Sequence, residues 1–323
     1  MSARTPAPVS GHIPPRTSPF SPGRTPGDGP AGAPAFRGRI GTDARSGHYA
    51  VPRRYRLHLS TACPDGLRVA VTHALLGLGD ELPVRLLPPT PDLPGNGYSA
   101  LRPLYEAGAH QYAGPATAPA LADDWTGRIV STHTPDITRD LALRFGGHGP
   151  ELCPPPARRE IAALARRCAG IAAAAQRAGV LGISGPGHDA PLGVLFRALG
   201  VLEERLAHRT FALGETVTAA DVELWVTLVE LDRVHRLHLD AAAVHRLAGH
   251  SALWAYARRL AEHPAFGGLL DLDGMARRHH ARCRGREAAG AAVPIVDWAV
   301  HLPSRPGDLP SPAAHPAGTD RTG

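Results

Sequence analysis

The hydrophobic pattern changes character near the middle of the chain, and this change limits the folds that the chain can adopt. Residues 55–60 (YRLHLS) alternate apolar and polar side chains, as a β-strand does. Residues 64–76 then carry apolar side chains at helical spacing, and residues 82–87 predict a second strand. From residue 156 onward the spacing is helical throughout. The sequence therefore predicts an α/β unit followed by an all-α unit.

Turn signals and helix boundaries predict the remaining elements. Residues 119–123 and 128–131 predict a hairpin around the turn DWTG, and residues 135–145 predict a short helix. Residues 88–118, rich in Pro, Gly and Tyr, are too long for an ordinary connection, so we expect a functional or mobile loop. The second half predicts helices over residues 156–179, 192–208, 218–234, 250–262 and 269–282.

Composition sets the expected boundaries of the folded part. Residues 1–40 and 303–323 are rich in Pro, Gly, Ser and Thr and carry few large apolar side chains, so we expect disordered arms. Between the arms we expect an α/β domain over residues 41–148 and a helical domain over residues 149–302. The net charge of +6 comes from arginines that alternate with acidic residues along helices, so we expect no nucleic-acid partner.

Targeting signals and metal motifs are weak in this sequence. No run reaches the roughly 18 apolar residues of a membrane span, and the N-terminus has no apolar signal region, so we expect a cytoplasmic protein without a membrane partner. The four cysteines form no CxxC pair, and we expect no metal site. The run HRLH at residues 235–238 could hold a metal by its spacing, but no carboxylate pattern supports it.

Cys63 lies where the first strand ends and a helix begins, directly before Pro64. A helix start offers unpaired N–H groups and a positive partial charge, which lower the pKa of a thiol, although Asp65 opposes the thiolate. Pro64 suits the first helical turn, where its missing N–H costs nothing. Gly66 occupies the position of a second cysteine in a dithiol motif, so a mixed disulfide at Cys63 needs an external thiol for release.

A structural role explains the same cysteine equally simply. Cys63 could be an inert small residue packed under the edge of the sheet. Cys168 lies on an apolar helix face, and Cys153 and Cys283 lie in loop-like or terminal segments. We expect structural roles for these three cysteines.

Several motifs together resemble the cytosolic glutathione transferases. They are the strand with its Cys-Pro helix start, Pro119 before the hairpin, and residues 214–221 (GETVTAAD), in which Thr218 and Asp221 also predict a capping box. The chain is more specifically similar to the Xi class, the glutathionyl-hydroquinone reductases, over residues 36 to 300. That similarity rests on FRGRI (36–40), RYRLHLSTACP with Arg68, GRIVST (127–132), TLVELDRVH (227–235) and MARRHHARC…VPIVDW near the end.

The resemblance implies a thioredoxin-like N-terminal domain, an α-helical C-terminal domain and an active site in the cleft between them. In the Xi class a cysteine takes glutathione from a glutathionyl-hydroquinone, and a second glutathione releases it from the mixed disulfide. Cys63 matches that nucleophile and Pro119 the cis-proline, while the backbone of Ala118 would pair with the thiol ligand. The implied thiol-binding set is Pro64, Arg68, Ala118, Pro119, His133 and Thr134. Homodimers are usual in the superfamily, so a homodimer is expected.

The chain departs from that pattern at two places. The Glu-Ser pair that holds the γ-glutamyl end of glutathione falls at His133 and Thr134, so the carboxylate is missing, and Asp136 is a nearby substitute. The tyrosines of the acceptor pocket fall at Leu181, His235, His279 and His280. A histidine can donate a hydrogen bond in place of a phenol. Drift on the surface explains these histidines as well in a chain that holds 18 of them.

Three functions agree with these features. The first is a thiol-dependent reductase that acts on a small-molecule thiol conjugate or a quinone-derived substrate, with Cys63 as nucleophile. Its co-substrate would be glutathione or another low-molecular-weight thiol such as mycothiol. The second is a ligand-binding protein of the same fold without turnover. The third is an interaction module whose disordered arms make the contacts.

Overall fold

A four-stranded sheet forms the centre of the first part of the chain. The computed structural model describes residues 36–181, 189–283, 287–288 and 295–303. The strand order is β2-β1-β3-β4, with β1 and β2 parallel and the other neighbours antiparallel. The strands are β1 (Tyr55–Leu59), β2 (Val84–Leu86), β3 (Ala120–Asp123) and β4 (Arg128–Ser131).

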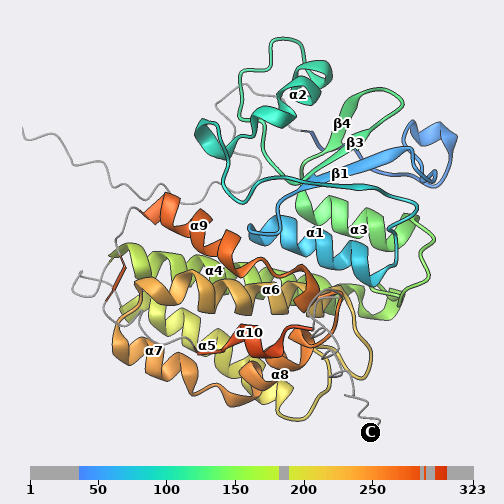
Figure 1. Ribbon diagram of the computed structural model, residues 1–323. Coiled ribbons are helices and arrows are strands. Elements are labelled where there is room, and N and C mark those ends of the chain that lie inside the picture. Colours follow the sequence, from blue (N-terminus) through green and yellow to red (C-terminus); the bar gives the residue numbers. More distant parts are fainter. Residues whose placement is uncertain (1–35, 182–188, 284–286, 289–294, 304–323) are drawn as a thin grey trace, which may run out of the picture.

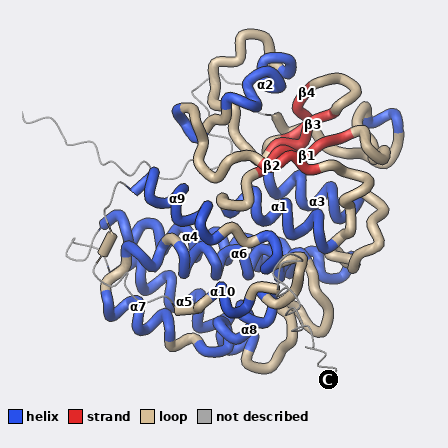
Figure 2. Tube along the Cα trace, in the orientation of Figure 1, coloured by secondary structure: helices blue, strands red, loops and turns tan. Residues whose placement is uncertain are grey.

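Helices cover both faces of this sheet (Figures 1 and 2). The helices α1 (Pro64–Leu75) and α3 (Thr134–Arg144) lie between the sheet and the helical domain, and α2 (Arg102–Gly108) lies on the opposite face. The central strand β1 is therefore covered on both sides, and even its polar residue His58 is only 3% exposed.

The second part of the chain is a bundle of helices around α6 (Ala219–Arg233), which contacts α4, α8 and α1. The predicted capping box starts this helix, since the Asp221 carboxylate accepts the backbone N–H of Thr218 at 2.8 Å. The same carboxylate accepts the Ala212 N–H at 2.7 Å and the Tyr256 hydroxyl at 2.9 Å. The other helices are α4 (Arg158–Leu181), α5 (Asp189–Leu206), α7 (Ala241–Ala248), α8 (Ser251–Ala261), α9 (Leu272–Cys283) and α10 (Trp298–His301).

The two parts share one apolar core, which runs from the sheet through α1 into α6. Across this interface the Arg68 Nε of α1 donates to the Glu223 carboxylate of α6 at 2.7 Å. Short 3-10 helices fill the connections: η1 (Ala44–Ser46), η2 (Pro94–Asn96), η3 (Ser99–Leu101), η4 (Pro155–Ala157), η5 (His235–His238) and η6 (Gly267–Leu269).

The predicted elements are confirmed in type and order, but the segment 88–118 is not a plain loop. It contains η2, η3 and α2 and has its own core, in which Tyr98, Leu101 and Tyr105 are at most 2% exposed. These three side chains have helical spacing, although only Tyr105 lies within α2, and the surrounding Pro and Gly residues obscure the pattern. Helices α7 and α10 are absent from the predicted set. The four residues of α10 are too few to show a helical period, whereas α7 buries Ala243, Val244 and Leu247 at helical spacing.

Residues 36–40, which composition assigned to the N-terminal arm, pack onto the folded domain. The backbone N–H of Gly38 donates to the Val130 carbonyl at 2.8 Å, and Ile40 is 2% exposed in the core. The Phe36 ring meets the Tyr105 ring edge to face at 5.3 Å. Two large apolar side chains within five residues anchor the segment together with the ion pairs of Arg37 and Arg39, because a preformed surface receives them. Residues 1–35 and 304–323 lie outside the described residues.

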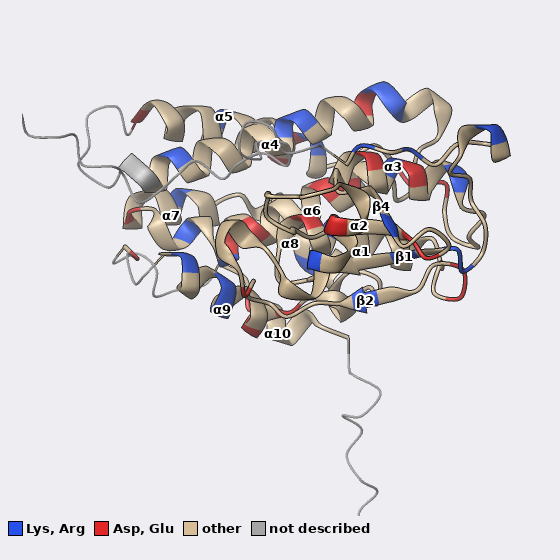
Figure 3. Ribbon diagram, turned by 90° about the horizontal axis from the view of Figure 1, so that it is seen from above, with Lys and Arg blue, Asp and Glu red and all other residues tan. Residues whose placement is uncertain are grey.

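Arginine and acidic side chains are interspersed along the helices, as Figure 3 shows for the view from above. The helices within the described ranges are all too short or too polar to cross a membrane.

Candidate active site

The Cys63 thiol is held at the N-cap of α1. Its Sγ donates to the Ser60 carbonyl at 3.3 Å and accepts the backbone N–H of Gly66 at 3.2 Å. A Cβ at residue 66 would overlap the Ser60 carbonyl oxygen and lie 3.1 Å from the sulfur. This crowding requires glycine at residue 66 and leaves no space for a second cysteine. A disulfide formed at Cys63 therefore has no local thiol to resolve it.

Burial raises the pKa of the Cys63 thiol, which is 7% exposed. The charge of Asp65 adds to this rise, whereas Arg278, the Gly66 N–H and Arg68 act in the opposite direction. The expected lowering of the thiol pKa is therefore wrong for this structure. A helix start favours the thiolate through a few partial charges, but loss of water around a buried sulfur costs more.

Arg278 on α9 reaches across from the helical domain to the segment that follows β2. Its Nη1 donates to the Pro89 carbonyl at 2.9 Å and to the Tyr98 hydroxyl at 3.0 Å. Figure 1 shows α9 beside the start of α1, where Cys63 lies. Sequence reasoning missed this cation, and only the helical run MARRHHARC, which repeats arginine at residues 278 and 282, could have signalled it.

Charged groups link Arg68 to the acceptor side of the site. The guanidinium of Arg68 lies 3.5 Å from the Asp65 carboxylate and also donates to the Thr227 hydroxyl at 3.4 Å. Burial raises the pKa of Glu230, but hydrogen bonding and charge from His235, together with Arg68 and Arg282, hold it below its usual value. His235 Nε2 lies 3.6 Å from Glu230 Oε1. His235 thus belongs to the network that reaches Arg68.

The strand register brings Cys63, Pro119 and His133 to the same end of the sheet, because β1 and β4 end where β3 begins. The peptide bond between Ala118 and Pro119 is cis, as the resemblance implies. Thr134 is the first residue of α3 and is 2% exposed. Its Oγ1 makes no hydrogen bond of good geometry among the described residues, and the Asp65 carboxylate is the acidic group beside it. A buried hydroxyl at a helix start that lacks a well-aligned hydrogen bond is a suitable group for a polar ligand.

Asp136 is not free to replace the missing glutamate. Its carboxylate lies 2.8 Å from Arg37 Nη2, 3.3 Å from Arg39 Nη1 and 2.9 Å from His133 Nδ1. Burial raises the pKa of Asp136, but the Arg37 hydrogen bond and the charges of His133 and Arg39 outweigh it and lower the pKa. Cations of this chain therefore occupy the carboxylate that a ligand ammonium would need.

The predicted acceptor residues do not all meet. His279 and His280 line a cavity of about 430 Å³ together with Arg233, Arg236, Leu237, Ala276, Arg277 and Glu287, and Cys63 is not among its lining residues. Leu181 ends α4, and its side chain lies outside the described residues. Their contact with a substrate at Cys63 stays a prediction, and His235 is the acceptor residue that the described contacts connect to Arg68.

Comparisons with known proteins agree on one family. Residues 187–259 match the model described as glutathione S-transferase, C-terminal domain. The chain is 26% identical to the glutathionyl-hydroquinone reductase YqjG of Escherichia coli, over 82% of this chain and 88% of the relative. It is 29% identical to the glutathionyl-hydroquinone reductase PcpF of Sphingobium chlorophenolicum, over 72% and 79%.

Solved structures show the same similarity. A glutathione transferase from Gordonia bronchialis has a TM-score of 0.67 and 32% identity, covering 76% of this chain and 81% of that one. The glutathione-bound structure of the Escherichia coli protein YqjG has a TM-score of 0.68 and 24% identity, covering 79% and 91%. A Xi class protein from Natrialba magadii has a TM-score of 0.69 and 24% identity, covering 88% and 89%.

Proposed function

The chain belongs to the glutathione transferase superfamily, and from this premise we propose that it is a thiol-dependent reductase with Cys63 as its nucleophile. The observation that supports this most directly is the position of the Cys63 sulfur at the start of α1. There it accepts a hydrogen bond from the Gly66 N–H, and the positive charge of Arg278 acts to lower the pKa of the thiol. The names of its curated relatives favour a glutathionyl-hydroquinone or a similar conjugate as substrate.

The reaction has two balanced steps. The Cys63 thiolate attacks the sulfur of the conjugate, a sulfur–sulfur bond forms and the carbon–sulfur bond breaks. The electron pair of the broken bond remains on the ring carbon, which takes up a proton, so the quinone-derived product leaves as a hydroquinone. A second free thiol then attacks the mixed disulfide, releases the oxidised thiol dimer and returns Cys63 to its reduced form.

The surroundings of Asp136 favour a thiol without a free ammonium group. Glutathione carries an α-ammonium at its γ-glutamyl end. Arg37 and Arg39 repel that charge at Asp136, and Arg68 lies 3.5 Å from Asp65, the other carboxylate near Thr134. Mycothiol has an acetylated amine and many hydroxyl groups, which suit the buried Thr134 hydroxyl. We therefore propose mycothiol or a thiol of similar chemistry as the co-substrate.

Intact-protein mass spectrometry tests both parts of this proposal. The reduced protein is incubated with oxidised glutathione or oxidised mycothiol, weighed, and then treated with the matching free thiol. We expect one adduct from mycothiol, its removal by free mycothiol, and no adduct on Cys63→Ser. The catalytic readout is the release of hydroquinone from a mycothiol conjugate, which is measured by chromatography. An adduct that survives in Cys63→Ser contradicts the assignment of the nucleophile.

A ligand-binding protein without turnover is the second candidate, and the raised pKa of the buried Cys63 thiol favours it. In that case the conjugate would raise the melting temperature but would not react.

All four cysteines are free thiols, which supports a reducing, cytoplasmic location. A homodimer stays a prediction that native mass spectrometry tests.

A further inference from the structure

The end of α9 and Glu287 bring together three side chains of the kinds that bind metals. One ligand atom each from His279, Cys283 and Glu287 lies within 4.8 Å of the other two. His279 Nε2 and Glu287 Oε1 are 3.4 Å apart. His279 and Cys283 are one helical turn apart and therefore share a face of α9. The backbone N–H of Ala288 donates to the Leu237 carbonyl at 2.8 Å, which holds Glu287 near η5.

Two members of this cluster are buried polar groups. His279 is 8% exposed and Cys283 is 5% exposed, and the His279 Nε2 atom has no hydrogen-bond partner among the described residues. The His238 ring meets the His279 ring at 5.0 Å and limits its rotation. A buried imidazole nitrogen without a hydrogen bond is costly for a protein, and a metal ion would satisfy it.

We propose that His279, Cys283 and Glu287 bind one Zn²⁺ ion, with the fourth coordination position open to the adjoining cavity. Nitrogen, thiolate sulfur and carboxylate oxygen together are a donor set that suits zinc, and three protein ligands with an open position are common. Tetrahedral ligands about 2.1 Å from zinc lie roughly 3.4 Å from each other. The His279–Glu287 pair already has this separation, and only Cys283 needs to approach. Binding releases the Cys283 thiol proton to solvent.

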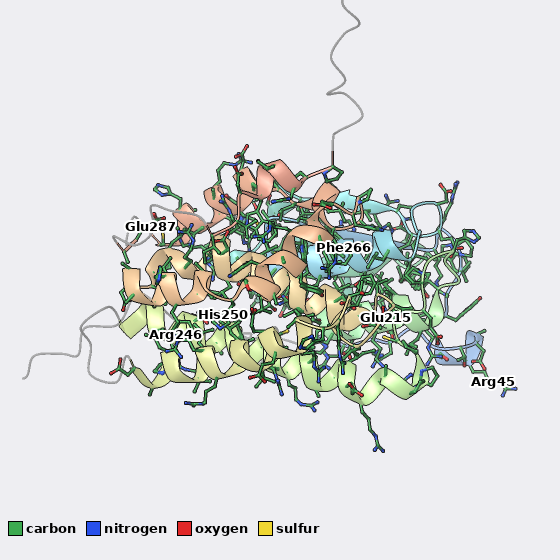
Figure 4. The ribbon with its side chains drawn as sticks, turned by 90° about the horizontal axis from the view of Figure 1, so that it is seen from below. Arg45, Glu215, Arg246, His250, Phe266 and Glu287 are labelled. Atoms are coloured by element: carbon green, nitrogen blue, oxygen red, sulfur yellow. The ribbon has the colours of Figure 1, made fainter. Side chains whose placement is uncertain are left out.

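The open position faces a cavity with excess positive charge. Its lining includes Arg233 and Arg277, and Arg236, which is paired with the buried Asp232, with Glu287 as the acidic member. Water or a small anion would therefore complete the zinc coordination. Figure 4 shows Glu287 at the end of the molecule opposite Arg45, far from the sheet. The site does not use Cys63, but it shares His279 with the predicted acceptor pocket, so zinc binding is measured apart from reductase activity.

Metal titration of the full chain tests this site. The protein is reduced with a phosphine, freed of metal with a chelator, and titrated with Zn²⁺ against a chromogenic chelator. We expect one Zn²⁺ per chain, in the wild type and in Cys63→Ser. Cys283→Ser, His279→Gln and the exposed Glu287→Gln should each weaken binding at least tenfold. Cys153→Ser and His280→Gln are matched controls that should bind as the wild type does.

Cobalt(II) gives a readout that depends on the ligands themselves. The cobalt-loaded protein should show a thiolate-to-cobalt charge-transfer band that is retained in Cys63→Ser and lost in Cys283→Ser. Circular dichroism of the metal-free variants reports whether they are folded, and Glu287→Gln keeps the test valid if a buried variant unfolds. Absence of zinc binding, or binding that Cys283→Ser and Glu287→Gln leave unchanged, overturns the proposal.

Discussion

The Arg278 guanidinium of α9 donates a 3.0 Å hydrogen bond to the Tyr98 hydroxyl, which belongs to the sheet domain. The contact joins the two domains beside Cys63, whose thiolate the Arg278 charge favours. Removing that charge should change the chemistry of the thiol more than the stability of the fold.

Arg278→Gln should raise the pKa of Cys63 further, because desolvation and Asp65 then act against fewer cations. Alkylation of Cys63 at pH 7 should slow several-fold, and its pH profile should move toward alkaline pH. The measurement is the iodoacetamide rate as a function of pH. The exposed neighbour Arg277 offers a matched control, Arg277→Gln, which should leave the profile in place. Equal profiles for both variants and the wild type would contradict the role of Arg278.

Gly66→Ala should destabilise the protein by about 2 kcal/mol, because the added Cβ overlaps the Ser60 carbonyl oxygen. The same change should displace the Cys63 sulfur and slow its alkylation. Urea unfolding gives the change in free energy. Gly170→Ala in α4, where an added Cβ meets nothing within 4 Å, is the control and should stabilise by about 0.5–1 kcal/mol.

Asp221→Ala should lower the free energy of unfolding by about 3 kcal/mol or more. It leaves the Thr218 N–H, the Ala212 N–H and the Tyr256 hydroxyl buried without an acceptor. Tyr256→Phe removes only one of these donors and should cost about 1 kcal/mol. Denaturant midpoints compare the two variants, and a smaller loss for Asp221→Ala than for Tyr256→Phe would contradict this account.

His58 should make the stability depend on pH. Burial lowers its pKa to about 4, with Arg85 and Arg56 adding to the effect and Asp124 opposing it. In the unfolded chain His58 takes up a proton near pH 6.5, whereas in the folded chain it does so only near pH 4. The free energy of unfolding is therefore highest above pH 6.5 and falls as the pH decreases to 4. The loss is at most about 3 kcal/mol. Urea unfolding at pH 7 and 5 should show a flatter dependence for His58→Gln, whereas His110→Gln, at an exposed position, should not change it.

His133→Glu should shift the thiol preference toward glutathione if the proposed function is correct. It supplies the carboxylate that an ammonium group needs beside Thr134, and it removes the imidazole that contacts Asp136. The readout is the ratio of glutathione to mycothiol adducts on Cys63 by mass. His133→Gln removes the imidazole without adding charge and should change this ratio less. An unchanged ratio in His133→Glu would argue against recognition of the γ-glutamyl end of glutathione beside Thr134.

Several parts of the site follow from the sequence because they depend on neighbouring residues. The N-cap position of Cys63 follows from the strand pattern before it and Pro64 after it, and the structure confirms it. The capping box of Thr218 and Asp221 is equally local. The pKa of the thiol was predicted in the wrong direction, because desolvation depends on how much of the folded protein surrounds the sulfur.

By itself the sequence determined the order of the strands and of the longer helices, the motif around Cys63 and the family that those motifs resemble. Backbone preferences and hydrophobic periods act over a few residues, so one segment at a time reveals them. Only the tertiary structure decided that Arg37 neutralises Asp136, 99 residues away, and that Arg278 meets Tyr98, 180 residues away. Such pairs form because packing of the whole chain brings together residues that are far apart in the sequence, and no local sequence pattern encodes which of them will meet.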